Sequence, residues 1–160
     1  SQDIGYTQIG DDNWIMAYVH IAHDCIVGNN TIFANNATLA GHVTIHDYAI
    51  LGGFTLVHQF CHVGEHAFTG MGTALGKDLP PYVMAFGAPG IPRGINNEGL
   101  KRHGFSAEDR AQIKQAYKIL YRQNLTLSDA ITELSGSDDI NMQLLTEFCQ
   151  RSQSGRGIIR

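Results

Sequence analysis

The sequence has few prolines and cysteines, and it contains no apolar run long enough to span a membrane. Charge of neither sign dominates, because 11 basic and 15 acidic residues give a net charge of -4. That balance favours neither nucleic acid nor an anionic membrane surface as a partner. No stretch resembles a signal peptide. We therefore expect one moderate domain with a small appendage, no membrane span and no nucleic-acid partner.

The three cysteines, Cys25, Cys61 and Cys149, do not suggest a disulfide framework. Cys25 and Cys61 are thirty-six residues apart, which in the repeat described below is two coils, or about 10 Å. A disulfide requires Cα atoms within about 7 Å of each other. We expect buried thiols in a reducing compartment, and therefore a cytoplasmic location.

The most regular feature present is a period of six. From position 9 to position 75, eleven of twelve residues at this spacing are apolar: Ile9, Ile15, Ile21, Val27, Phe33, Leu39, Ile45, Leu51, Val57, Val63, Thr69 and Leu75. The fourth residue after each of them is mostly small or thin. A period of six fits neither an amphipathic helix nor an amphipathic strand. It indicates a parallel β-helix of hexapeptide repeats, with three hexads and thus eighteen residues in each coil.

The β-helix is expected to occupy residues 1–97, including a terminal loop, and a helical domain is expected over residues 98–160. The repeat pattern breaks at 77–81, where two prolines cannot both serve a strand ladder. Because repeat-like sequence is present from the start of the chain, we expect further coils upstream.

Three helices are predicted in the second part. The first begins at a capping box over 106–109, the second near Ser128, and the third after Ser137. Five residues of the third are expected on one buried face: Ile140, Leu144, Leu145, Phe148 and Cys149. This part is too short for a core of its own, so we expect it to pack on the β-helix or on a neighbouring subunit.

Steps of eighteen residues bring several polar groups to one corner of the β-helix over three successive coils. They are His23, Asp24, Gly41, His42, His58 and Gln59, with His20 on the adjoining side. A histidine beside an aspartate matches a general base with its orienting carboxylate, and a glycine amide one coil away matches an oxyanion donor. The remaining repeat histidines, His46, His62 and His66, are expected on the solvated surface.

A zinc site is the competing use of so many histidines. Trimeric β-helix carbonic anhydrases share three histidines across a subunit interface. Their pattern has two histidines five residues apart and a third two coils earlier. The sequence contains neither spacing, so we predict no metal.

Five segments resemble the bacterial UDP-N-acetylglucosamine O-acyltransferases that begin lipid A biosynthesis: 20–25, 34–42, 57–60, 96–105 and 116–121. The resemblance covers nearly the whole chain. It implies a left-handed β-helix with a triangular section, assembled as a homotrimer. The implied reaction transfers a 3-hydroxyacyl group from acyl carrier protein to the 3-hydroxyl of UDP-N-acetylglucosamine, without a cofactor.

The resemblance also implies residue roles. His23 would be the general base, Asp24 would orient it, and the Gly41 amide would stabilise the oxyanion. Substrate contacts are implied for two groups: His20, His42, His58 and Gln59 with sugar, phosphate or acyl groups, and Asn96, Glu98 and Arg102 with the nucleotide. His103 stands where a second phosphate-binding arginine is expected. Met71 would close the acyl groove early and select a shorter acyl chain.

Two other classes remain open. One is a related hexapeptide-repeat acyltransferase, either a UDP-sugar N-acyltransferase or a sugar acetyltransferase that uses acetyl-coenzyme A. The segment 96–105 and the helical tail argue against it. The other is a solenoid that only presents a binding surface, and the His-Asp-Gly column argues against that.

Overall fold

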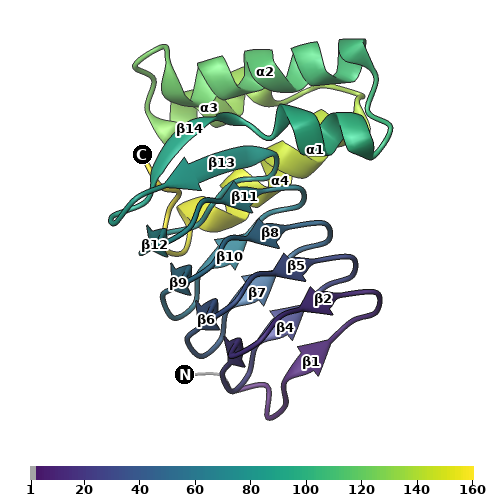
Figure 1. Ribbon diagram of the computed structural model, residues 1–160. Helices are drawn as coiled ribbons and strands as arrows, with labels where there is room; N and C mark the ends of the chain where they lie inside the picture. Colours follow the sequence, from purple (N-terminus) through teal and green to yellow (C-terminus); the bar gives the residue numbers. More distant parts are fainter. Residues whose placement is uncertain (1–2) are drawn as a thin grey trace.

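The computed structural model describes residues 3–160 and shows a stack of coils with helices at one end (Figure 1). Within these residues the coils contain twelve two-residue strands: β1 (Gln8–Ile9), β2 (Trp14–Ile15), β3 (His20–Ile21), β4 (Ile26–Val27), β5 (Ile32–Phe33), β6 (Thr38–Leu39), β7 (Thr44–Ile45), β8 (Ile50–Leu51), β9 (Leu56–Val57), β10 (His62–Val63), β11 (Phe68–Thr69) and β12 (Ala74–Leu75). Each strand ends on one of the twelve positions with the period of six. The predicted parallel β-helix is confirmed.

The strands form three parallel sheets, one on each side of the coil. Their orders are β1-β4-β7-β10, β2-β5-β8-β11 and β3-β6-β9-β12, and the second continues beyond β11. Partners are eighteen residues apart, as in the pairs Gln8–Ile26 and Ile26–Thr44. The register therefore places residues separated by eighteen positions directly above one another.

Apolar residues fill the inside of the coils, as the pattern predicts. Val27, Leu39 and Leu51 are buried on the three sides, and the thin positions Cys25 and Cys61 are fully buried between them. All three cysteines are free thiols, as expected. Burial raises the pKa of both Cys25 and Cys61, so these thiols stay protonated and serve as core residues.

A non-glycine residue with positive φ recurs every six residues along most of the stack, at the turn between two sides. At the corner that carries the histidine column these residues are Asp24, His42 and Phe60, with φ of 59°, 62° and 67°. This backbone conformation is uncommon for residues other than glycine. It recurs here because each corner must turn the chain in the same way.

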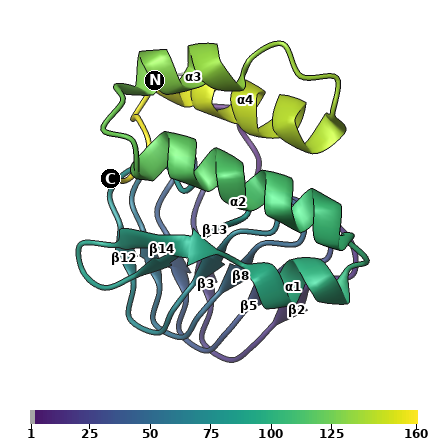
Figure 2. The same cartoon turned by 90° about the horizontal axis from the view of Figure 1, so that it is seen from above.

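The end of the stack is closed by a hairpin. Strand β13 (Val83–Phe86) pairs in parallel with β11, and β14 (Ile91–Ile95) returns antiparallel to β13. Helices then follow in the order α1 (Asn97–Arg102), α2 (Ala107–Tyr121), α3 (Leu127–Leu134) and α4 (Ile140–Gln153). Figure 2 shows α2, α3 and α4 running side by side over the end of the β-helix.

The helix caps largely follow the sequence prediction. Ser106 and Asp109 form a reciprocal capping box at the start of α2. Helix α3 begins at Leu127, because Thr126 rather than Ser128 supplies the cap. The expectation of a buried Ile140 is wrong. It follows the capping residue Asp139 directly at the start of α4 and is 70% exposed.

The helical part packs on the β-helix, as expected. A second cluster of buried residues lies at this end: Tyr82, Leu100, Ile113, Ala116, Leu120, Ala130, Ile131, Leu134, Met142, Leu145, Phe148, Cys149 and Ile158. Tyr82 comes from the end of the coils, and Tyr117 and Ile159 of the helical part join the core of the coils. The two parts are therefore packed on each other. None of the helices in residues 3–160 is long and apolar enough to cross a membrane.

Candidate active site

The predicted corner column is present at one end of the β-helix. His23 and Asp24 lie at the turn after β3, and Nδ1 of His23 is 2.8 Å from Oδ2 of Asp24. The other oxygen of Asp24 accepts a hydrogen bond from the Gly5 amide at 2.7 Å. The hydrogen bonds from His23 and Gly5 lower the pKa of Asp24, so its carboxylate stays charged and can hold the imidazole in one orientation.

Gly41 lies one coil above His23, as the eighteen-residue step predicts. A Cβ on Gly41 would be 2.6 Å from Cε1 and 2.7 Å from Nε2 of His23, so only glycine allows the ring to lie there. Within residues 3–160 no group accepts a hydrogen bond from the Gly41 amide. The site thus combines an imidazole, its carboxylate partner and a free backbone donor, which are the groups that general-base catalysis with an oxyanion donor requires.

His42 completes the column. Its ring stacks on Phe60 with centroids 4.6 Å apart and meets the His23 ring edge-on at 5.3 Å. Nε2 of His42 lies 3.8 Å from the Asp24 carboxylate and 3.1 Å from that of Asp3. The stack on Phe60 fixes the plane of His42 and thereby the direction in which its nitrogens can bind substrate.

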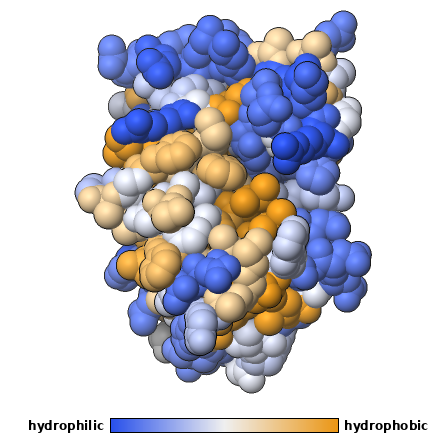
Figure 3. Space-filling view, viewed as in Figure 1, coloured by the Kyte–Doolittle hydropathy of each residue, from blue (hydrophilic) through white to orange (hydrophobic). Residues whose placement is uncertain are grey.

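A groove of about 630 Å3 runs along the adjoining β3-β6-β9-β12 side. His20 and His58 line it together with mostly apolar neighbours: Thr38, Leu39, Ala40, Leu56, Val57, Ala74, Leu75, Gly76 and Pro89. Figure 3 shows apolar groups over the body of the β-helix, whereas the helical end is mostly hydrophilic. An apolar channel with histidines along it suits an acyl chain whose polar end must be held.

The residues predicted to contact the nucleotide lie outside the corner column. Glu98, Arg102 and His103 are exposed at and just beyond α1, whereas Asn96 is 7% exposed and caps that helix. The Asn96 side chain accepts from the Gly99 amide at 3.2 Å and donates to the His66 carbonyl at 3.2 Å, so both ends of its amide are already used. Its role within this chain is to shape the loop that carries Glu98 and Arg102.

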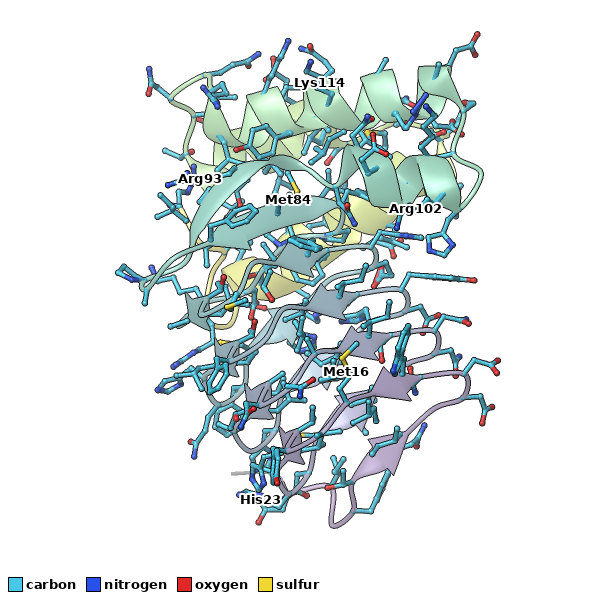
Figure 4. All side chains as sticks on the ribbon, viewed as in Figure 1. Met16, His23, Met84, Arg93, Arg102 and Lys114 are labelled. Carbon is cyan, nitrogen blue, oxygen red and sulfur yellow. The ribbon has the colours of Figure 1, made fainter. Side chains whose placement is uncertain are left out.

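One chain does not bring the two groups together. Figure 4 places His23 at the lower end of the stack and Arg102 near the helical end on the opposite side. Gln59 lies exposed beside His58 in the corner column. Met71 is 83% exposed on a corner, with Gly53 of the preceding coil as its neighbour in the column. It fills no core, as expected.

The expectation that His46, His62 and His66 are solvated is wrong. Nε2 of His46 lies 3.1 Å from Nδ1 of His62, and Nδ1 of His46 lies 2.9 Å from the Glu65 carboxylate. Phe148 of α4 packs against both histidine rings. The helices packed across this side cover these rings. Burial is the main reason that the pKa of His62 falls to about 4.

His66 is 8% exposed and stacks on Tyr48, with ring centroids 4.7 Å apart. Phe105, from the segment after α1, closes over it at 5.0 Å. Burial again lowers the pKa to about 4, with a further contribution from His103. His66 is thus a neutral core residue that ties the coils to the helical end.

The predicted column also brings possible metal ligands together. Ligand atoms of His23, Asp24 and His42 lie within 4.8 Å of one another. Two imidazoles and a carboxylate are donors that a divalent ion accepts. In the structure, however, Asp24 is already hydrogen-bonded to His23. That no metal is required stays a prediction.

Another hollow contains none of the predicted site residues. It measures about 980 Å3 between β14 and α2 and is lined by Arg110, Lys114, Lys118 and Arg122, spaced one helical turn apart. Ile95 and Tyr117 form part of its apolar floor. This lining contains no histidine or carboxylate that could act as a general base, so the corner column remains the candidate site.

Fold and column together define a hexapeptide-repeat transferase. A sequence model for bacterial transferase hexapeptide repeats matches residues 6–41. A second, described as UDP N-acetylglucosamine O-acyltransferase, domain 2, matches residues 78–159, just over half of the chain. The chain belongs to the UDP-N-acetylglucosamine O-acyltransferase family.

Individual relatives agree with this assignment. An acyl-[acyl-carrier-protein]–UDP-N-acetylglucosamine O-acyltransferase from Thiobacillus denitrificans is 58% identical over 99% of this chain and 62% of its own length. One from Ectopseudomonas mendocina is 57% identical over 85% of this chain and 53% of its own. The solved UDP-N-acetylglucosamine acyltransferase of Francisella novicida superposes with a TM-score of 0.94 at 44% identity, over 98% of this chain and 58% of that one. The chain thus spans about three-fifths of such relatives.

Two contacts around the column were not predicted. The eighteen-residue step places Phe60 directly after His42 in the column, but it does not show that the two rings stack. Arg156 contacts Nδ1 of His58 from ninety-eight residues away, at the far end of the chain. No repeat or spacing predicts that contact.

Proposed function

We propose that this chain carries out acyl transfer from 3-hydroxyacyl-acyl carrier protein to the 3-hydroxyl of UDP-N-acetylglucosamine, the first step of lipid A biosynthesis. The observation that carries the proposal is the His23–Asp24 hydrogen bond beside the free amide of Gly41. These groups can serve as a base, its orienting carboxylate and an oxyanion donor, and they lie on two successive coils. Membership of the family supplies the substrates.

In the proposed reaction Nε2 of His23 takes the proton from the sugar 3-hydroxyl. The sugar oxygen attacks the thioester carbon, and the Gly41 amide donates to the oxyanion that forms. When the intermediate collapses, the carbon–sulfur bond breaks and His23 returns the proton to the leaving thiolate. Asp24 keeps the Nδ1 proton in place throughout, so that Nε2 is free to accept.

The remaining predicted residues are proposed to bind the substrates. His20 and His58 line the apolar groove, which fits the acyl chain, and His42 and Gln59 lie in the corner column. Glu98 and Arg102 are exposed and free to hold the nucleotide, Arg102 through charge-assisted bonds to phosphate. His103 would contact the substrate beside Arg102, and Asn96 would act by shaping their loop.

The protein is proposed to work as a homotrimer in the cytoplasm, without a cofactor. Arg102, in the same helix as Glu98, lies far from His23 within one chain, so a complete site requires a neighbouring copy to supply one of the two groups. Cyclic symmetry would then give three equivalent clefts. Three buried free thiols fit a reducing compartment. Activity should persist in the presence of a chelator.

The test is an acyl-transfer assay on the full-length protein with matched donors and acceptors. We expect the 3-hydroxyacyl carrier-protein thioester and UDP-N-acetylglucosamine to give an ester product, identified by mass. Transfer only to an amino sugar nucleotide would instead indicate a UDP-sugar N-acyltransferase. Transfer only from acetyl-coenzyme A would indicate a sugar acetyltransferase. Either result would overturn the proposal, as would the absence of any transfer.

A further inference from the structure

The last residues of the chain return to the β-helix and form a built contact with it. The amide of Asp78 donates to the Gly157 carbonyl at 2.9 Å, and the amide of Ile159 donates to the Asp78 carbonyl at 2.8 Å. Ile158 and Ile159 are 3% and 4% exposed. This stretch (Figure 1) is therefore held by backbone bonds and buried apolar side chains directly after Arg156.

The Asp78 side chain reinforces this attachment. It is 3% exposed, accepts from the Ser152 hydroxyl of α4 at 2.6 Å, and accepts from the His62 amide of β10 at 2.8 Å. Gly157 in turn donates to the Ser152 carbonyl at 2.9 Å. The Asp78 carboxylate thus joins the coils to helix α4, and the Asp78 backbone holds the tail. Together these bonds limit where the Arg156 side chain can reach.

Arg156 reaches the candidate active site. Its guanidinium contacts Nδ1 of His58, which lines the proposed acyl groove together with His20. A guanidinium has only N–H donors, so Nδ1 must be the acceptor. The competing partner of Nδ1 is the Gln59 carbonyl at 3.4 Å, which would require a proton on Nδ1. That contact is long, and a charged donor makes the stronger bond.

We propose that Arg156 is a positioning residue that fixes the tautomer of His58. With Nδ1 accepting from Arg156, the imidazole carries its proton on Nε2 and presents an N–H donor to an acceptor oxygen of the bound substrate. Without Arg156, the imidazole can carry its proton on Nδ1 instead and donate it to the Gln59 carbonyl. Nε2 then has no proton, and the N–H donor to the substrate is lost. The catalytic consequence rests on the proposed function, whereas the tautomer does not.

The direct test is 15N NMR of the full-length protein labelled at histidine, with His58→Ala used to assign the His58 signals. We expect the wild type to show an unprotonated Nδ1 and a protonated Nε2 at neutral pH. Arg156→Ala should shift this pattern towards a protonated Nδ1, whereas Arg156→Gln retains a neutral donor and should largely preserve it. Arg93→Ala, which removes an exposed arginine on β14, should leave it unchanged. A protonated Nδ1 in the wild type, or an Arg156→Ala spectrum identical to it, overturns the proposal.

Kinetics separate positioning from a purely structural effect. In Arg156→Ala the substrate loses one neutral hydrogen-bond donor, the Nε2–H of His58. This loss should lower kcat/KM by about 2- to 10-fold. In a background that already carries His58→Ala, the same substitution should have no further effect. Losses that simply multiply in the double variant contradict the inference. Anchoring of the tail uses backbone atoms and Asp78, so the variants should unfold at the wild-type temperature.

Discussion

The imidazole of His23 and the carboxylate of Asp24 are adjacent in sequence and hydrogen-bonded at 2.8 Å, although Asp24 itself has the left-handed φ of a corner residue. The corner turn is what directs two neighbouring side chains towards each other. His23 remains exposed while its partner is largely covered, with side-chain exposures of 68% and 9%. The proposed base can therefore meet substrate, and the carboxylate proposed to orient it is protected.

Replacing Asp24 with Asn should lower kcat while leaving the assembly intact. Asparagine can still bond to Nδ1 of His23, but it supplies no charge to stabilise the imidazolium that forms during proton transfer. The loss should be smaller than that of His23→Ala, because Asp24 orients the base and does not carry the proton. Single-turnover rates of both variants, measured side by side, check the order. An Asp24→Asn enzyme less active than His23→Ala would refute it.

Gly41→Ala should inactivate the site without unfolding the protein. The added methyl group would lie 2.6 Å from the His23 ring, so the base must move. Displacements of about 1 Å cost about 100-fold in rate. The φ of Gly41 is not in the positive region, so alanine fits the backbone there. Turnover and thermal unfolding should be measured together, and unchanged turnover would show that the ring does not work from this position.

Met71→Gly should shift donor preference to longer acyl chains. Met71 is 83% exposed and follows Gly70 on a corner, where it fills no core of its own chain. If it closes the end of the groove, excluding each extra methylene is worth about 1–3 kcal/mol, or about 10- to 200-fold in specificity. Competition between 3-hydroxyacyl donors of increasing length measures this. An unmoved optimum would mean that Met71 does not set the length.

Acid should destabilise the fold through its buried histidines. The pKa of His62 and of His66 falls from 6.5 to about 4 on folding, mainly through burial. Between these values the unfolded chain binds more protons than the folded one, so the free energy of unfolding decreases as the pH falls from about 7 to 4. For each histidine the loss is up to about 3 kcal/mol.

His66→Phe provides the matched variant, since it keeps the stack on Tyr48 and removes the titrating group. Urea unfolding at pH 7.5 and 4.5 should show a clearly smaller pH dependence in this variant than in the wild type. Equal pH dependence in the two proteins would exclude His66 as a source of the acid sensitivity.

The sequence was sufficient for the parts of the fold that repeat. Val27, Ile45 and Val63 occupy the same inward position in successive coils, so a period of six predicts their burial. The eighteen-residue step likewise predicts that Gly41 lies over His23. Both inferences use only local geometry that is copied from coil to coil.

Features that depend on the helical end could not be predicted in this way. His66 is buried by Phe105, and no repeat relates the two residues. Arg156 reaches His58 because backbone atoms hold the tail, and backbone atoms leave no signal in the sequence. Ile140 has the spacing of a core residue, yet its place directly after the cap of α4 leaves it in solvent.

The most direct test of the account is the turnover of His23→Ala in the full-length enzyme, with its assembly and unfolding temperature measured alongside. Loss of a general base should reduce kcat by about 10²- to 10⁴-fold, and the fold should be unaffected because His23 is exposed. Near-normal turnover in a properly assembled His23→Ala protein would contradict the account.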